Sequence, residues 1–340
     1  MTATGSRLLA VPDDLLTRVL VGVNRDDHDA AAAACGAFRA IIRGPRFLRL
    51  RREFGFAERG VVLLSSRRGL QQGESIDGLI EIRMAHKRGV ERISLEKKVT
   101  TIESTTDGGA RIFICTKVTT DNEVLVLDAS RRRWSRFATL PLNQQAHCME
   151  WHGGLLYVAG GYATDTPGYL SSLHAFNEVT GLWETLPSMP HACMCATSAL
   201  IGDQLFLVGG FSYADDPEGG MSNILQIYDI PSRTWRMGTS KSDGLNTSDP
   251  LVVDGKLIRV DRIEVVYDPQ FDTWTQSLGP RQGWNGVRRA CTHNGRAVVF
   301  FSDGLVLERD TDGSWSPYDA EEGIRAGDRN QTVFGSVLLG

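Results

Sequence analysis

A tryptophan recurs at nearly regular intervals, and this repeat constrains the fold more than any other feature. Successive copies stand 49, 52, 39 and 41 residues apart, at Trp134, Trp183, Trp235, Trp274 and Trp315. A turn-forming residue precedes each copy by six residues at Asp128, Asn177, Asp229 and Asp268, and by five at Asp310. This spacing predicts five hairpins of one length, in which the Asp or Asn side chain accepts hydrogen bonds within its own turn.

Two further apolar runs precede every hairpin. We therefore expect each repeat to contain four strands in an antiparallel meander, with the tryptophan on the outermost strand. Two of these runs, "LLYVAGGY" and "QLFLVGGF", contain Gly160-Gly161 and Gly209-Gly210, where the backbone must turn sharply or pack closely. Repeats of about 40–50 residues with four strands each are typical of β-propeller blades.

The two chain ends are expected to form one more blade. Residues 60–96 contain three strand-like runs without a tryptophan, and the C-terminal "QTVFGSVLLG" adds one or two more. The prediction is a mainly β chain with a six-bladed propeller whose last blade is built from both ends, which leaves no open sheet edge. The alternative, an open β-sandwich, does not account for the regular period.

The N-terminal segment has the pattern of three short helices instead. In "VPDDLLTRVLV", Pro12 suits a helix start, and the apolar residues that follow fall on one face. One longer helix is expected from Asp27 through an alanine-rich stretch to Ile42, where a glycine–proline pair ends it. We therefore expect a helical module at residues 1–55 and a propeller at residues 56–340.

Both parts resemble known families. The Gly-Gly pair followed by the Asp/Asn-to-Trp hairpin resembles a kelch repeat, and residues 155–190 are the best copy. The runs "VPDDLLTRVL", "RDDHD" and "CGAFR" resemble an F-box in their order and position. Val11 stands where the F-box has Leu, Phe38 stands where it has Trp, and Ala30–Ala34 replace larger apolar residues. These departures reduce the apolar area that can be buried.

The resemblance to F-box/kelch-repeat proteins implies a function. The chain would be the substrate-recognition subunit of an SCF-type cullin-RING ubiquitin ligase, with no catalytic activity and no cofactor of its own. Its F-box would dock a Skp-family adaptor, and through it the cullin and RING subunits, by Val11, Pro12, Leu15, Leu16, Val19, Leu20 and Phe38. Two alternatives stay open: a kelch scaffold outside any ligase, and a propeller enzyme with a metal site at the ring axis.

A target protein is expected to bind the long loops at one face of the propeller. In a meander, the loop from the second to the third strand and the connector to the next blade share a face. These segments carry aromatic residues and arginine, which dominate interface energetics. The expected contacts are Tyr162, Tyr169, His191, Phe211, Tyr213, Arg281, Trp284 and Arg288. Nearby acidic residues, Asp215, Asp216 and Glu218, would suit a basic segment of the partner.

The sequence contains no strong motif for catalysis or metal binding. Cys193 and Cys195 are expected on one strand, with both side chains in the apolar core, and the histidines have no ligand spacing. The net charge of −4 argues against a nucleic-acid binder. The start "MTATGSRLLAVPDD" does not resemble a signal peptide, so we expect reduced thiols and a cytoplasmic or nuclear protein without a membrane span.

Overall fold

The chain divides into two compact units. One comprises Met1–Arg59 with Leu338–Gly340, and the other comprises Gly60–Val337. The computed structural model describes residues 16–17, 19–20, 28–42, 47, 50, 58–66, 80–86, 89–95, 102–106, 111–118, 121–128, 133–165, 167–213, 220–241, 250–260, 263–280, 287–293, 295–301, 305–318 and 331–339. Among the described residues, no helix is long and apolar enough to cross a membrane.

The N-terminal unit is helical where it is described. It contains α3 (His28–Ala34) and α4 (Gly36–Ile42), and residues 16, 17, 19, 20, 47 and 50 are helical as well. The single helix expected up to Ile42 is therefore divided at Cys35. The Phe38 amide donates to Cys35 Sγ at 3.4 Å, and the Arg39 amide donates to the Cys35 carbonyl at 3.2 Å. Cys35 thus caps the start of α4, and the glycine after it has a low helix propensity.

The core of the helical unit is small. Leu20 and Phe47 are buried, and Phe47 packs edge-on against His28 with ring centroids 5.1 Å apart. The partly buried residues around them are Ala31, Phe38, Ile41, Ile42 and Leu50. Because alanines make up most of α3, that helix contributes little apolar area to this core.

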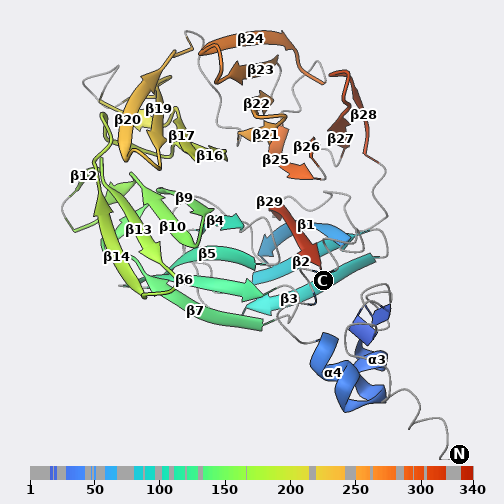
Figure 1. Cartoon of the computed structure of the whole chain (residues 1–340). Coiled ribbons are helices and arrows are strands. Elements are labelled where there is room, and N and C mark those ends of the chain that lie inside the picture. The colour runs from blue at the N-terminus through green and yellow to red at the C-terminus, as the bar shows by residue number, and fades with distance from the viewer. Residues whose placement is uncertain are drawn as a thin grey trace, which may run out of the picture. The chain divides into compact units, whose positions relative to one another are not determined.

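The described strands form six four-stranded sheets (Figure 1). The first sheet contains, in spatial order, β29 (Gln331–Leu339), β1 (Glu58–Ser66), β2 (Ile80–His86) and β3 (Gly89–Leu95). The second contains β4 (Ile102–Thr106), β5 (Arg111–Val118), β6 (Asp121–Asp128) and β7 (Arg133–Thr139). The third contains β9 (Cys148–His152), β10 (Leu155–Ala159), β13 (Leu173–Asn177) and β14 (Leu182–Leu186).

The remaining sheets repeat the same order along the chain. The fourth contains β16 (Thr197–Ile201), β17 (Gln204–Val208), β19 (Leu225–Asp229) and β20 (Thr234–Gly238). The fifth contains β21 (Leu251–Val253), β22 (Lys256–Val260), β23 (Ile263–Asp268) and β24 (Thr273–Leu278). The sixth contains β25 (Val287–His293), β26 (Arg296–Phe301), β27 (Val306–Arg309) and β28 (Trp315–Pro317).

The second to sixth sheets pack side by side in chain order. Contacts join the first strands of consecutive sheets, from β4 to β9, to β16, to β21 and to β25. The fourth strands, β7, β14, β20, β24 and β28, lie at the opposite edges of their sheets, and each carries one of the repeated tryptophans. Neighbouring strands within these sheets are antiparallel. The prediction of a mainly β chain is therefore confirmed.

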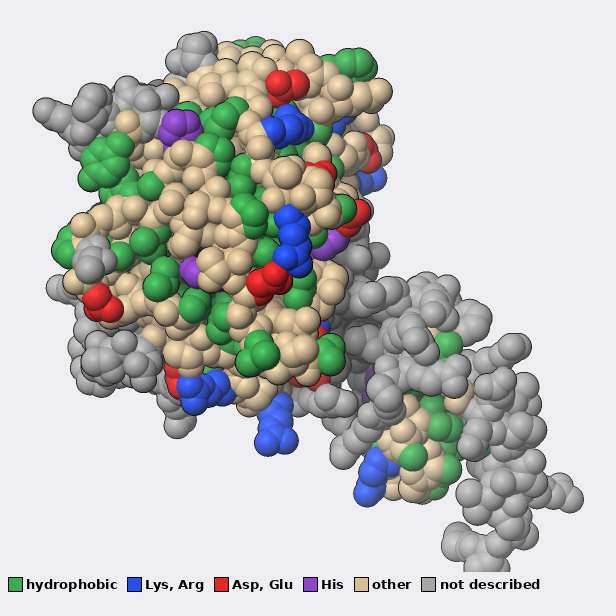
Figure 2. All heavy atoms as spheres, turned by 60° about the vertical axis from the view of Figure 1, so that its left-hand side comes forward, with side chains coloured by type: hydrophobic (Ala, Val, Ile, Leu, Met, Phe, Trp, Pro, Cys, Tyr) green, Lys and Arg blue, Asp and Glu red, His purple; other side chains and the backbone are tan. Residues whose placement is uncertain are grey.

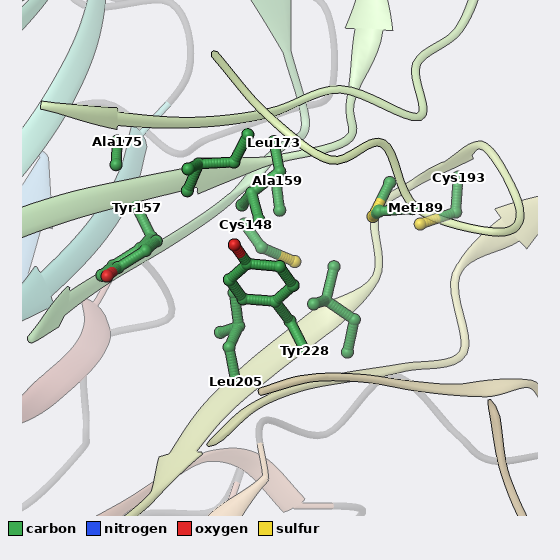
Figure 3. Close-up of a cluster of buried hydrophobic side chains, with 11 residues drawn as sticks. Cys148, Tyr157, Ala159, Leu173, Ala175, Met189, Cys193, Leu205 and Tyr228 are labelled. Carbon is green, nitrogen blue, oxygen red and sulfur yellow. The ribbon is translucent and has the colours of Figure 1, made fainter. Parts of the chain in front are cut away.

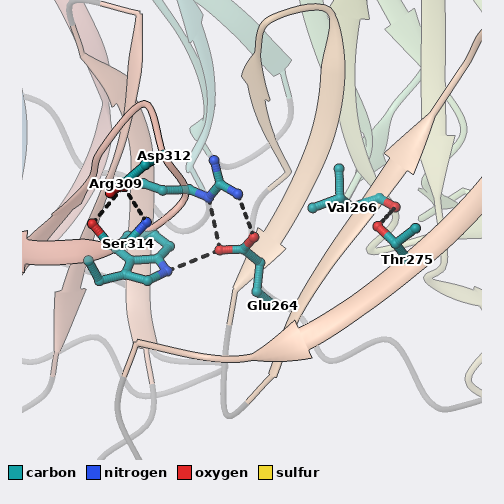
Figure 4. A network of polar contacts seen from close by, with 7 residues as sticks. Glu264, Val266, Thr275, Arg309, Asp312 and Ser314 are labelled. Carbon is teal, nitrogen blue, oxygen red and sulfur yellow. Dashed lines mark hydrogen bonds and ion pairs between the residues drawn. The ribbon is translucent and has the colours of Figure 1, made fainter.

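Most of the repeated tryptophans link their sheet to the one before it. In three repeats the indole N–H donates a hydrogen bond of 2.7–2.8 Å to a backbone carbonyl of the preceding sheet. The acceptor is the last residue of that sheet's fourth strand or the residue directly after it. The pairs are Trp183 to Thr139, Trp235 to Pro187 and Trp274 to Thr239. Trp315 donates instead to the carboxylate of Glu264 in the preceding sheet. The same carboxylate accepts two hydrogen bonds from the Arg309 guanidinium (Figure 4).

The turn residues accept hydrogen bonds in their own turns at three of the five hairpins. A side-chain oxygen of Asn177, Asp229 and Asp268 accepts from backbone amides two or three residues further on. In the last hairpin the prediction was wrong: Asp312 accepts from Ser314 (Figure 4), whereas Asp310 pairs with Arg296 at 3.1 Å. Asp310 stands five residues before Trp315, whereas the other turn residues stand six before their tryptophans. In this shorter turn the accepting side chain is that of Asp312. The turn after Asp128 lies outside the described residues.

Buried side chains fill the space between the third and fourth sheets (Figure 3). Tyr157 and Leu173 come from the third sheet, and Leu205 and Tyr228 from the fourth; all are at most 2% exposed. Tyr228 also packs on Trp235 in the neighbouring strand, with ring centroids 5.0 Å apart. Similar buried clusters join the second sheet to the third, the fourth to the fifth and the fifth to the sixth.

Candidate functional site

Short strand pairs join the long loops to the connectors between sheets. β11 (Tyr162–Ala163) pairs with β12 (Gly168–Tyr169) in its own loop and with β8 (Gln144–Gln145) in the connector before its sheet. In the next repeat, β18 (Phe211–Ser212) pairs with β15 (Cys193–Met194) in the same way. These loops and connectors therefore form one hydrogen-bonded surface. We call it the loop face, and it comprises the described residues of 143–147, 160–172, 187–196, 209–213 and 220–224.

The Gly-Gly pairs allow the connectors to approach the loops this closely. Gly161 has a φ of +104°, and a Cβ there would lie 2.8 Å from the Gln145 carbonyl oxygen. Gly210 has a φ of +91°, and a Cβ there would lie 2.6 Å from the Met194 carbonyl oxygen. Only glycine accommodates both the left-handed backbone and the contact. The Gly-Gly signal in the sequence thus marks where the loop face is assembled.

Three of the expected contact residues form a tyrosine cluster, which consists of Tyr162, Tyr169 and Tyr213. Tyr162 and Tyr169 are partners across β11 and β12, with ring centroids 6.3 Å apart and planes at 65°. Tyr169 stacks on Tyr213 of the next repeat at 4.6 Å and 27°. Tyr213 is 54% exposed. Desolvation, and then the neighbouring Tyr213, raise the pKa of Tyr169, so its phenol stays neutral at physiological pH.

Phe211 continues this aromatic surface toward two methionines. Phe211 is the strand partner of Met194 and forms an isolated β-bridge with Met221. Phe211 is partly buried, whereas Met221 is 51% exposed. Methionine side chains adapt their shape to irregular partners, so this part of the loop face suits contact with another molecule.

His191 is fixed by a residue that the sequence patterns did not single out. The buried Gln226 side chain accepts a hydrogen bond from the His191 amide at 2.9 Å and donates one to the His191 carbonyl at 3.1 Å. The glutamine therefore anchors the connector's backbone and leaves the imidazole partly exposed. Arg281 and Trp284 lie outside the described residues. Arg288 lies in β25, but its side chain is outside the description.

The loop face carries few charges. Within its described segments, Asp165 is the only acidic or basic residue apart from histidines, and its carboxylate accepts a hydrogen bond from Asn143 at 2.8 Å. Two contacts between neighbouring sheets, Arg233–Glu184 and His152–Asp203, involve Arg233 and Asp203 in turns at the opposite ends of the strands. Figure 2 brings the β12 and β14 side of Figure 1 forward and shows hydrophobic and uncharged polar side chains with charged ones between them.

The two neighbouring cysteines do not share an environment, which corrects the sequence prediction. Cys193 lies in β15 and is buried, and desolvation raises the pKa of its thiol to about 12. Cys195 is exposed and lies outside any strand, with a φ of +53° and its amide bonded to the Ala146 carbonyl at 2.9 Å. The left-handed backbone at Cys195 breaks the strand. Among the described residues, no group of three His, Cys, Asp or Glu side chains could hold a metal ion.

The residues expected to dock an adaptor differ in exposure. Leu16 and Leu20 are buried, at 6% and 4% exposure, so they stabilise the helical unit rather than offer a surface. Val19 is 65% exposed, and Phe38 is partly buried against the core around Leu20. Val11, Pro12 and Leu15 lie outside the described residues. Among the described residues of the expected docking face, Val19 is therefore the exposed one.

Comparisons with known proteins agree with the repeat pattern. The family model described as the Kelch motif matches residues 146–190, which span the third sheet. The F-box/kelch-repeat protein At1g67480 of Arabidopsis thaliana is 22% identical over 80% of this chain and 73% of its own length. A protein of the same plant, At1g27420, whose name also contains the words F-box and kelch-repeat, is 23% identical over 85% of this chain and 84% of its own length.

Two further likenesses concern part of the chain and the fold. The Kelch-like protein terF of Aspergillus terreus is 31% identical over 113 residues, which are 28% of this chain and 25% of that protein. The solved structure of YjhT has a TM-score of 0.56 at 13% identity, over 76% of this chain and 98% of its own. The matched motif, the repeated hairpins and these relatives together support the assignment of this chain as a kelch-repeat protein.

Proposed function

We propose that this chain is the substrate-recognition subunit of an SCF-type cullin-RING ubiquitin ligase. The helical unit docks a Skp-family adaptor, the loop face holds a target protein, and other subunits perform the catalysis. The observation that carries this proposal is the similarity to F-box/kelch-repeat proteins over 80–85% of the chain. A ligase receptor works where ubiquitination occurs, so we place the protein in the cytoplasm or the nucleus.

The proposal treats each four-stranded sheet as a propeller blade. Six such sheets occur in the described residues, and the first strands of five of them follow one another in contact. The remaining sheet combines β29 from the C-terminal end with β1–β3. A blade built from both ends would close the ring, so that each blade packs between two neighbours. In this arrangement residues 1–55 form the F-box module and residues 56–340 form the propeller.

The adaptor contact in this proposal is centred on Val19. Among the residues expected to dock the adaptor whose side chains the structure describes, Val19 is the exposed one, at 65%. The departures of the F-box pattern at Val11, Phe38 and the α3 alanines reduce the apolar area available for docking. We therefore expect an affinity for the adaptor below that of a chain with the full F-box pattern.

A binary capture experiment tests the proposal. Purified full-length protein is immobilised and incubated with a purified Skp-family adaptor, alongside the Val19→Asp variant. The matched control is Val179→Asp, because Val179 is 91% exposed and lies in a turn of the kelch repeat. We expect wild type and Val179→Asp to capture the adaptor and Val19→Asp to lose at least about tenfold in affinity, since a charge at an interface core is strongly unfavourable.

Two outcomes would contradict the proposal. If the wild-type protein does not bind the adaptor, the helical unit is not a working F-box, and the chain is a kelch scaffold outside a ligase. If Val19→Asp binds as well as wild type, the docking face has been placed wrongly. Circular dichroism of all three proteins separates loss of binding from loss of folding.

A further inference from the structure

The tyrosine cluster presents an exposed aromatic plane. Tyr169 covers one side of Tyr213 by stacking at 4.6 Å, and Tyr213 nevertheless remains 54% exposed. Tyr169 is itself braced by Tyr162 at 6.3 Å across a strand pair. The plane of Tyr213 is therefore held in position by the preceding repeat before any partner arrives, which lowers the entropic cost of binding on it.

The one Asp, Glu, Lys or Arg within the described segments of the loop face is acidic. Asp165 lies in the turn between β11 and β12, so in the chain it stands between Tyr162 and Tyr169. The acidic residues Asp215, Asp216 and Glu218, which follow Tyr213 in the sequence, lie outside the described residues. The described segments of the loop face contain no Lys or Arg, and the Arg259 guanidinium, whose Nη1 lies 3.9 Å from where a Cβ of Gly209 would be, is buried. A partner that contacts the tyrosine cluster thus meets aromatic rings and negative charge together.

The protein itself already combines these groups around an arginine. The Arg111 guanidinium carbon lies 4.7 Å from the Trp151 ring centroid and 5.3 Å from that of Phe113. Glu178 of the neighbouring sheet accepts hydrogen bonds from both terminal nitrogens of Arg111. An arginine held by aromatic faces and a carboxylate is therefore an arrangement that this fold makes between its own sheets.

We propose that the tyrosine cluster docks an arginine side chain from a basic segment of the target protein. The planar guanidinium stacks on Tyr213, while the Asp165 carboxylate of the loop face attracts its charge. Lysine would gain the attraction but lacks the planar group that stacks. The inference rests on the proposed function, because it specifies the chemistry of the target that the loop face holds.

Nucleic acid is the other ligand that stacks on exposed aromatic rings, and the charges disfavour it. Single-stranded nucleic acid is bound by aromatic platforms that lie in positively charged grooves. The described loop face has no Lys or Arg, and the whole chain has a net charge of −4. Its phosphates would be repelled, whereas a basic peptide would be attracted.

A peptide selection tests this chemistry without knowledge of the target. A phage-displayed library of random peptides is selected on the immobilised full-length protein, on Tyr213→Ala and on Phe271→Ala. Phe271 is the matched control, since it is an aromatic residue with 68% exposure in a turn at the opposite ends of the strands. The selected peptides are then synthesised with arginine, lysine or citrulline, labelled with fluorescein and measured by anisotropy on all three proteins.

We expect arginine to be enriched on wild type and on Phe271→Ala but not on Tyr213→Ala. Replacing arginine with citrulline or lysine, or Tyr213 with alanine, should weaken binding about threefold to tenfold. Tyr213→Phe should retain binding, because the ring rather than the hydroxyl does the stacking. Asp165→Asn should weaken both the arginine and the lysine peptide.

Several outcomes would overturn the inference. They are enrichment of acidic or uncharged peptides, no enrichment at all, equal binding by Tyr213→Ala, and preferential binding of a fluorescein-labelled oligothymidylate over the arginine peptide. These outcomes are separate from the adaptor experiment. If the protein selects arginine peptides but captures no adaptor, the ligase proposal ends and this inference stands. If it captures the adaptor but selects no arginine peptides, the ligase proposal stands and this inference ends.

Discussion

At the scale of single residues, the repeated hairpin turn depends on an accepting oxygen and not on a charge. Asn177 accepts hydrogen bonds from the amides of Val179 and Thr180, and Asp229 accepts from the amide and hydroxyl of Ser232. The carboxylate adds a pH dependence that the amide lacks. The Ser232 side chain, then the Ser232 amide and Gln204, hold the pKa of Asp229 below its usual value.

This difference predicts how acid affects stability. The pKa of Asp229 is lower in the folded state than in the unfolded state, where it is about 4. Its carboxylate therefore contributes to the free energy of unfolding above about pH 4, and this contribution is lost as the pH falls through the folded-state pKa. Asp229→Asn should therefore fold stably at pH 7 and lose less stability than wild type on going to pH 3. Urea unfolding at the two pH values measures this, and the reciprocal Asn177→Asp should lose more. Equal losses in all three proteins would contradict the prediction.

At the scale of elements, the loop face is built by backbone contacts between segments far apart in the sequence. Gly161 donates to the Cys193 carbonyl of the following connector at 2.8 Å, and a Cβ on Gly161 would lie 2.8 Å from the Gln145 carbonyl oxygen of the preceding connector. The Gly-Gly pair therefore touches the connectors on both sides of its sheet. Its glycines should matter for close packing as well as for backbone conformation.

Two alanine substitutions separate these effects. Gly181 has a φ of +69° and nothing within 4 Å of a Cβ, so Gly181→Ala should cost only backbone strain, about 1 kcal/mol. In Gly161→Ala the new methyl group would also meet the Gln145 carbonyl, which adds about 2 kcal/mol of overpacking. The free energy of unfolding from urea titration should fall about three times as far for Gly161→Ala. Equal costs would mean that the connector moves away freely.

The sequence predicts the long strands well because their side chains carry a period of two and their hairpins a fixed spacing. It does not predict β8, β11, β12, β15 and β18, because two-residue strands are too short to show a period. The split of the helix at Cys35 depends on a sulfur acceptor that propensities do not include. The sequence identifies Tyr162, Tyr169 and Tyr213 as loop aromatics. Their stacking across two repeats depends on the pairing of β11 with β12, which the sequence does not predict.

At the scale of the whole molecule, two surfaces are assigned different partners. Val19 represents the adaptor surface in the helical unit, and Tyr213 represents the target surface on the loop face. A substrate receptor must engage both partners at once, while each surface must be separable by mutation. A scaffold outside a ligase would lack the first interaction, and a propeller enzyme would need neither.

Affinity purification from cells, read by quantitative mass spectrometry, tests this claim most directly. Tagged wild type, Val19→Asp and Tyr213→Ala are compared, with Val179→Asp and Phe271→Ala as surface controls. We expect Val19→Asp to lose the Skp-family adaptor and cullin but keep the other captured proteins, and Tyr213→Ala to show the opposite pattern. If wild type captures no adaptor or cullin, or if both variants lose the same proteins, the protein is not a two-surface receptor of a ubiquitin ligase.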